Sequence, residues 1–266
     1  MAKAKGQQGG AVVNYEEELA RRASFFKESV STIALGSFIS IRGGVMQFQG
    51  NQLEGNQIEC VILDGIMTKL DYAQDFDPQK PAVPRCYAFG RDAKKMVPHE
   101  QCADKQHDQC KGCWADEMGS ADKGRGKHCK DQWRLGLISS SALREGVEAI
   151  DKAEVAFIQV PVMSVKGWAA HVSKIGEVLK LPPFGVVSNV KCVPDPKSQY
   201  KLVFSVVSQI KDKGIMGALM KKADEVSGGI AFPFPEIEDT PAPAKRGRDQ
   251  GKGKPNGQAK KGPRKF

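Results

Sequence analysis

Residues 33–49 read IALGSFISIRGGVMQFQ, and apolar and polar side chains alternate along much of this segment. A period of two residues is typical of a β-strand with one buried face. Gly36, Gly43 and Gly44 interrupt the alternation, and glycines within strands often mark bulges or the corners of a barrel. The segment therefore predicts bent strands of the kind that form a small barrel.

Regular elements are expected on both sides of this segment. Residues 57–72 (QIECVILDGIMTKLDY) predict one or two strands, broken near Asp64 and Gly65. Ser164 is a candidate N-cap for a helix over residues 165–180. Further strands are expected over residues 133–139, 155–162, 184–192 and 199–207, and further helices over residues 15–29, 141–151 and 208–226.

Five or more short strands, few helices and one long insertion favour a mainly β (α+β) domain built on a partly open oligonucleotide-binding barrel, the OB-fold. A general α+β domain with a mixed sheet fits the pattern equally well. In either case we expect a flexible leader over residues 1–13, a core formed by residues 14–85 and 133–226, an insertion over residues 86–132, and a linker with a disordered basic tail over residues 227–266.

Length and composition set the class of protein. The chain has 266 residues and a mass of 28.9 kDa, which is enough for a real hydrophobic core. No apolar run approaches the roughly 20 residues needed to cross a bilayer. The first ten residues are polar and basic, unlike a secretory signal. We therefore expect a cytoplasmic protein whose seven cysteines are thiols or metal ligands.

The positive charge is concentrated at the C-terminus. The formal net charge is +9, and residues 240–266 alone carry nine basic groups and one acidic group. This tail, rich in Pro, Gly and Lys, has almost nothing to bury, so we expect it to be disordered and to bind nucleic acid by releasing counterions from phosphates. A solubilising tail, or one that binds an acidic protein, is the alternative. The candidate contacts are Lys245, Arg246, Arg248, Lys252 and Lys254.

Five of the seven cysteines and three of the four histidines fall within residues 86–132. A C-x2-C pair can place two thiolates on one ion, and two further thiolates complete a zinc tetrahedron. We predict one structural Zn²⁺ with four cysteine ligands. These ligands are Cys86, Cys110, Cys113 and Cys129. Cys102 is the first substitute for one of them, and the other possible substitutes are His99, His107 and His128.

Catalytic motifs are missing from the sequence. There is no phosphate-binding P-loop and no G-x-S-x-G elbow. The zinc deaminase pattern fails because no His-x-Glu precedes the C-x2-C pair. A zinc ion with four cysteine ligands has no open position for water. We therefore expect a protein that is not an enzyme.

Aromatic side chains in polar or loop contexts are candidates for stacking on nucleic-acid bases. Tyr72, Phe76, Tyr87 and Trp114 satisfy this criterion, and Arg42 beside two glycines is a candidate phosphate contact. The alternative for each aromatic residue is a place in the core, where most Phe and Trp residues lie.

Several segments resemble a family of tailed-phage proteins: FISIRGGVMQFQG, VILDGIMTKLDYAQDFDPQKPAVPRCYAFG, CKGCWADEMGSADKGRGKHCKDQWRL and PPFGVVSNVKCVPDPKSQYKLVF. The resemblance covers most of residues 30–210 and implies a single-stranded DNA-binding protein of phage replication or recombination, acting in the host cytoplasm. The general plan is also similar to the helix-destabilising protein of T-even phages, an OB-fold with an inserted zinc subdomain.

Two features depart from these relatives. The T-even protein uses three cysteines and one histidine, so only the C-x2-C pair carries over, to Cys110 and Cys113. Proteins of this type usually end in an acidic tail that recruits replication enzymes, whereas this chain ends in a basic one. The resemblance therefore implies single-stranded DNA as the partner, and leaves the contact with replication or recombination proteins open.

Binding to single-stranded DNA is accordingly the leading functional hypothesis. The main alternative is a zinc-containing transcription or regulatory factor that binds duplex DNA or RNA polymerase. A nuclease that depends on Mg²⁺ and a structural protein that neutralises packaged DNA are further alternatives. Preference for single strands, preference for duplex, strand cleavage and indifference between polyanions would separate these four hypotheses.

Overall fold

The computed structural model describes residues 38–73, 83–122 and 124–234. By its internal contacts the chain divides into two compact units, Met1–Glu236 and Ile237–Phe266, and every described residue belongs to the first. The predicted leader, the predicted helix over residues 15–29, Phe76 and the basic tail with its five candidate contacts lie outside the described residues.

Strands make up most of the regular structure within the described ranges. They are β1 (Phe38–Arg42), β2 (Val45–Phe48), β3 (Asn51–Gln52), β4 (Gln57–Asp71), β5 (Cys86–Gly90), β6 (Lys130–Ser139), β7 (Ala156–Val160), β8 (Val186–Asp195) and β9 (Gln199–Gln209). The α-helices are α2 (Ser141–Glu145), α3 (Val147–Lys152), α4 (Val162–Lys174) and α5 (Lys213–Gly229). Short helical turns cover Glu54–Asn56, Trp114–Asp116, Ile175–Leu179 and Pro183–Gly185.

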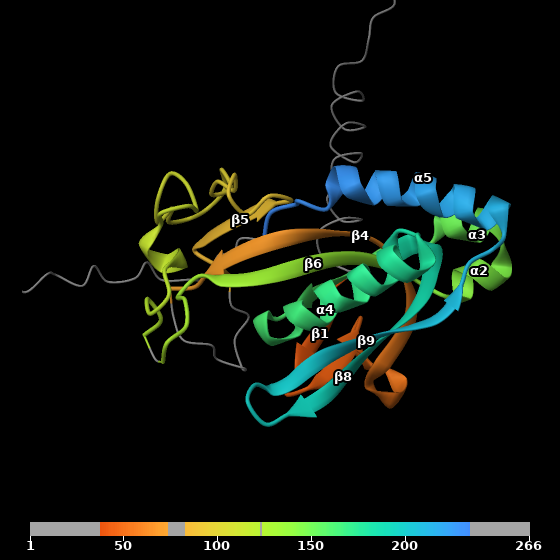
Figure 1. Ribbon diagram of the computed structural model, residues 1–266, viewed down its shortest axis with the longest axis horizontal. Coiled ribbons are helices and arrows are strands. Elements are labelled where there is room, and N and C mark those ends of the chain that lie inside the picture. The colour runs from red at the N-terminus through yellow and green to blue at the C-terminus, as the bar shows by residue number, and fades with distance from the viewer. Residues whose placement is uncertain (1–37, 74–82, 123, 235–266) are drawn as a thin grey trace, which may run out of the picture. The chain divides into compact units, whose positions relative to one another are not determined.

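All nine strands join one sheet, shown in Figure 1. Eight of them follow the order β3-β2-β1-β7-β6-β4-β8-β9, and β5 pairs with β4 outside this path. The pairing of β1 with β7 is parallel, and the other described pairings are antiparallel. The protein is therefore a mixed α/β protein with a strongly curled half-barrel sheet, which agrees with the coarse prediction of bent strands.

The longest strand, β4, holds the sheet together. Its first residues pair with β8, its last residues pair with β5, and β6 runs along most of its length. The register with β6 shifts between Ile62 and Asp64, as a bulge does. The predicted break near Asp64 and Gly65 is thus an irregularity inside one strand.

The curl brings the first hairpin back to the last strands. Asn56 donates from Nδ2 to the carbonyl oxygens of Gly44 (2.6 Å) and Cys192 (3.1 Å), and its Oδ1 accepts the N–H of Met46 (2.7 Å). A Cβ on Gly44, which has a φ of +79°, would lie 3.5 Å from Cβ of Tyr200 on β9. The β1–β2 turn therefore closes against β8 and β9 through one side chain and one close contact.

Two apolar clusters cover the two faces of the sheet. Helix α5 lies on one face, where Leu219 packs with Val61 and Phe157. Helix α4 lies on the other face, where Trp168 packs with Ile62. Figure 1 shows these helices on opposite sides of the strands. Neighbouring residues of a strand point to opposite faces, so β4, β6 and β7 each supply residues to both clusters.

Two predicted helix starts were wrong. Ser164 lies inside α4, and its buried hydroxyl accepts the N–H of Leu202 at 2.8 Å instead of capping the helix. Helix α5 begins at Lys213, because Ser208 and Gln209 still pair with β8, and Asp212 caps it by accepting the N–H of Ile215 at 2.8 Å. The predicted β8–β9 hairpin is confirmed. No helix among the described residues is long and apolar enough to cross a membrane.

Candidate functional site

The four predicted zinc ligands come from three places around the ends of β4 and β6. Cys86 begins β5 and pairs with Asp71 at the end of β4, while Cys129 immediately precedes β6. Cys110 and Cys113 form a tight turn in which the N–H of Cys113 donates to the carbonyl of Cys110 at 3.2 Å. The turn that carries Cys110 and Cys113 therefore lies, along the chain, between Cys86 at the start of β5 and Cys129 at the start of β6.

All four cysteines line one small cavity of about 20 Å³. A space of this size accommodates roughly one water molecule or one ion. Each of the four residues is at least nine-tenths buried. As the side chains stand, however, no three His, Cys, Asp or Glu residues in the described ranges are grouped closely enough to hold a metal ion. The donor set and the cavity fit zinc, whereas the positions of the sulfur atoms do not yet form a coordination sphere.

The first substitute, Cys102, lies next to the same site without lining the cavity. Its Sγ accepts the N–H of Tyr87 at 3.1 Å and lies 3.2 Å from the carbonyl oxygen of Tyr87. A hydrogen bond with Cys86 is the largest cause that lowers the pKa of Cys102 to about 7. Cys102 is therefore held against one predicted ligand and is the nearest alternative to it.

The histidines of the insertion are engaged in other contacts. His128 bonds through Nδ1 to the buried carboxylate of Asp71, and the ring of His99 stacks on Tyr87 at 5.2 Å. His107 lines the cavity, but its Nδ1 meets the backbone of Gln109. Cysteine is thus the residue type that dominates the cavity.

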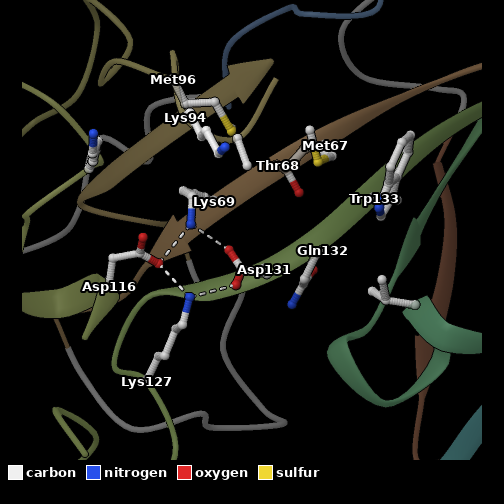
Figure 2. Close-up of a pocket in the computed structure, with 13 residues that line it drawn as sticks. Met67, Thr68, Lys69, Lys94, Met96, Asp116, Lys127, Asp131, Gln132 and Trp133 are labelled. Atoms are coloured by element: carbon white, nitrogen blue, oxygen red, sulfur yellow. Dashed lines mark hydrogen bonds and ion pairs between the residues drawn. The ribbon is translucent and has the colours of Figure 1, made fainter. Parts of the chain in front are cut away.

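A buried lysine lies beside the cavity, and sequence analysis missed it. Lys69, on β4, is 6% exposed, and its Nζ lies 2.7 Å from both Asp116 and Asp131. Lys127 contacts the same two carboxylates at 2.9 and 3.0 Å. Figure 2 shows these four side chains as a closed ring of ion pairs. A lone lysine in the apolar run IMTKLDY was the only sequence signal for it.

The ring is neutral overall, and its ammonium and carboxylate groups act on the nearby thiols in opposite directions. Burial is the largest effect on Cys110 and raises its pKa to about 11, while the charge of Lys69 acts in the opposite direction. Burial likewise raises the pKa of Cys129, and Lys69 again opposes it. Because a zinc ion with four thiolates has a net charge of about −2, a buried ammonium group favours the charged centre.

A groove of about 520 Å³ opens on the other side of the ion-pair ring. Its floor includes Met67, Met96 and Trp133, as Figure 2 shows. Lys94 and Lys111 also line it; both are exposed, and neither makes an ion pair with a described residue. Apolar and aromatic surface with free cations at its rim suits a base and a phosphate, which makes this groove a candidate nucleic-acid site.

None of the four described residues that the sequence predicted to bind nucleic acid lines this groove. Arg42 is exposed at the β1–β2 turn. Trp114 is 45% exposed and lies 5.4 Å from the ring of His128. Tyr72 is half-buried after β4, where burial first and Cys129 second raise its pKa to about 12.

Tyr87 requires a correction. It is 3% exposed, and its ring packs against Phe89 (5.6 Å), His99 (5.2 Å) and Phe234 (5.1 Å). The polar sequence around Tyr87 suggested a loop, but Tyr87 pairs with Leu70 in the sheet and is covered from both sides. In this structure it offers no face to a base. Trp133, which the sequence placed in an ordinary strand, is the aromatic residue of the groove.

Comparisons with known proteins add no constraint, since no family model, curated protein or solved structure matches the chain significantly.

Proposed function

We propose that this protein binds single-stranded DNA, without catalysing a reaction, in the replication or recombination of a phage. The proposal rests first on the order of the strands. In the chain, β4, β6 and β7 are followed by α4 and then by β8 and β9, and in the sheet they stand as β7-β6-β4-β8-β9. An OB barrel has this arrangement, with its first strand between the second and the fourth and a helix after the third.

The position of the groove supports the same reading. In OB-folds, the connection between the first two strands and the turn between the last two flank the bound oligonucleotide. Here the connection from β4 to β6 carries the whole cysteine-rich insertion, and the groove lies between that insertion and the start of α4. We assign base stacking to Trp133 and phosphate contacts to Lys94 and Lys111, with the basic tail adding affinity that does not depend on sequence.

The insertion is proposed to form around one structural Zn²⁺ held by the four cysteines that line the small cavity. The carrying observation is that residues far apart in sequence, Cys86, Cys110, Cys113 and Cys129, line one space of ionic size. Zinc would supply folding free energy to the insertion and so fix one wall of the groove.

A binding titration tests the central proposal. The protein truncated after Glu236 lacks the tail, and fluorescence anisotropy would compare its affinity for a labelled oligothymidylate of about 20 nucleotides with that for a duplex of equal length. We expect at least about tenfold preference for the single strand. Equal affinity for the two forms would leave the tail as the source of binding and would favour another function for the folded unit.

Charge reversal locates the site. Changing Lys94 and Lys111 to Glu should weaken single-strand binding by about tenfold or more, since each removes a phosphate contact. The matched control changes Lys211 and Lys213 to Glu. These two exposed lysines at the start of α5 do not line the groove. A loss of the same size in both pairs would show a general charge effect and remove the groove from the proposal.

Metal analysis tests the zinc. Elemental analysis of the purified protein should find about one zinc ion per chain. Replacing Cys110 with Ser should abolish zinc binding, whereas Cys60, which is buried in the sheet body, can be replaced without loss of the metal. Zinc retained by the Cys110 variant and lost from a Cys102 variant would instead place Cys102 in the coordination sphere.

A further inference from the structure

Arg134 on β6 is completely buried, with 0% of the residue exposed. It follows Trp133 in the strand, so the two side chains point to opposite faces of the sheet. The candidate groove lies on the Trp133 side. Arg134 therefore places a cation on the face of the sheet that the groove does not use.

The guanidinium group is enclosed by four aromatic rings. Its central carbon lies 4.1 Å from the ring centre of Phe232, 4.5 Å from Phe89, 4.8 Å from Phe234 and 5.7 Å from Phe38. Attraction between the cation and these ring faces favours the charged form. Burial acts against that form and lowers the pKa of Arg134 to about 9.

Arg134 uses only the N–H donors of Nη1. Its Nη1 donates to the carbonyl oxygens of Ile230 (3.1 Å) and Phe232 (2.6 Å). Nε and Nη2 have no partner among the described residues. These two atoms form the side of the guanidinium that binds an oxyanion through two parallel hydrogen bonds. A buried cation with that edge free, and no carboxylate paired to it within the described ranges, has the geometry of an unfilled anion site.

The cover of this site is the segment that follows α5. Residues 230–234, here called the strap, supply both accepting carbonyls and two of the four rings, and Figure 1 shows this segment running from the end of α5 towards β5. The ring of Phe234 lies nearly parallel to that of Phe89, at 6.1 Å and 14°. Phe232 packs against Phe38 and Phe157 at 5.8 and 4.9 Å.

The strap therefore covers a continuous aromatic surface. Phe38, Tyr87, Phe89 and Phe157 lie beneath its two rings, around the guanidinium. Aromatic faces beside a cation with a free fork are the combination that binds a base together with its phosphate. Phe232 and Phe234 occupy the positions that bases would take.

We propose that the strap is a displaceable cover over a second strand-binding face, in which the Nε–Nη2 edge of Arg134 binds a phosphodiester and Phe89 and Tyr87 stack on bases. This proposal rests on the proposed function, because its ligand is the single strand. The face would be filled only after the strand has displaced the two phenylalanines.

The test compares four forms of the full chain: the wild type, the Phe232→Ser/Phe234→Ser double variant, Arg134→Gln, and the triple variant. Anisotropy with labelled oligothymidylate at about 200 mM salt would limit the contribution of the tail. Removing the cover should tighten binding by about tenfold, and adding Arg134→Gln should cancel this gain. In the wild-type background Arg134→Gln should also weaken binding, because the strand that displaces the strap loses the same phosphate contact.

Two results would overturn the strap proposal: a double variant that binds no more tightly than the wild type, or a gain that persists without Arg134. The proposed function is judged separately, by whether the wild type prefers single strands and depends on Lys94 and Lys111. If the strap variants unfold, hydrogen exchange on the wild type replaces them. The amides of residues 230–234 should lose protection when oligothymidylate is added, and unchanged protection would contradict the proposal.

The chain itself offers a competing oxyanion. Glu236 lies two residues beyond Phe234 in the sequence. If its carboxylate occupies the fork, Glu236→Gln should lower the midpoint of thermal unfolding. In that case the affinity for oligothymidylate should not increase when the two strap rings are removed. That pair of results would make the site an internal ion pair. The phosphodiester is supported if Glu236→Gln leaves the midpoint unchanged and the double strap variant still binds more tightly only when Arg134 is present.

Discussion

The sheet body and the cysteine-rich insertion are ordered by different means. The body holds two large apolar clusters, one on each face of the sheet, with Leu135, Leu137 and Ile158 fully buried. The buried apolar side chains of the insertion form two small groups, centred on Met96 and on Ala115, and both groups contain predicted zinc ligands. The body can therefore fold by burial, while the insertion requires another source of free energy.

The sheet body and the insertion therefore differ in what stabilises them, although both belong to one unit of the chain. Burying a large apolar side chain contributes about 1.5–3 kcal/mol, and the body has many such side chains. A segment with few of them does not offset its loss of conformational entropy without a staple such as a metal. We therefore expect the two regions to respond independently to metal removal and to core substitutions.

Metal removal should produce the largest effect. Structural zinc supplies about 10–16 kcal/mol of apparent binding free energy in zinc-finger peptides, so a strong chelator should unfold residues 96–129 and leave the body intact. Hydrogen exchange followed by mass spectrometry would show lost protection in the insertion only. Loss of protection in β8 and β9 as well would mean that the two regions fold as one, and the comparison would fail.

A core substitution should have the converse effect. Leu135 is fully buried in the cluster under α4, and Leu135→Ala should lower the free energy of unfolding of the body by about 2–5 kcal/mol. Urea titration followed by tryptophan fluorescence would measure the loss. The zinc content of the folded variant should stay at the wild-type value. The exposed Val178→Ala is the matched control and should change stability by less than about 0.5 kcal/mol.

Lys69 is the residue that links the two regions, since it belongs to β4 and pairs with Asp116 of the insertion. Lys69→Met should destabilise the protein by about 2–3 kcal/mol, which is below the full cost of breaking a buried pair because Asp131 is 47% exposed. Zinc affinity, measured by competition with a chelator, should fall in parallel. Lys127→Met removes a more exposed partner of the same carboxylates and should have the smaller effect on both quantities.

The smallest expected effect is a pH dependence confined to the body. Burial lowers the pKa of His171, whose Nε2 lies 3.0 Å from the Ser188 hydroxyl. The unfolded chain then binds a proton that the folded chain does not, so stability is full above about pH 6.5 and falls below it, by at most about 1.4 kcal/mol per pH unit. Urea titrations at about pH 7.5 and 5.5 should show this difference, and His171→Gln should reduce it. An equal pH dependence in that variant would assign the titration to other groups.

The sheet body was largely predictable because its strands follow local patterns. Residues 57–72 and 199–207 were expected to form strands and lie in β4 and β9, while Gly43 and Gly44, expected to mark bulges or barrel corners, lie in the β1–β2 turn. The parallel pairing of β1 with β7 was not predictable, because it depends on the curl of the whole sheet. The start of α4 was missed for a related reason: Ser164 binds the backbone of a strand that is remote in sequence.

The candidate site was predictable in part. The cysteine spacing anticipated the four residues that line the small cavity. The groove was not anticipated, because Trp133 and Lys69 stand in strand-like runs where a core position is the usual expectation. The prediction that Tyr87 stacks on a base was wrong because Phe234, which covers its ring, lies far along the chain. No local sequence pattern indicates that contact.

The closure of the half-barrel has a mechanical consequence. The unit β1–β3 is joined to the rest of the sheet by two register pairs with β7, and its turn is tied to β8 through the side chain of Asn56. The pairing of β8 with β9, in contrast, extends over ten residue pairs. Under a pulling force, the first hairpin should peel away before the rest of the sheet yields. The barrel would then open along one seam while most of its backbone ladder remains intact.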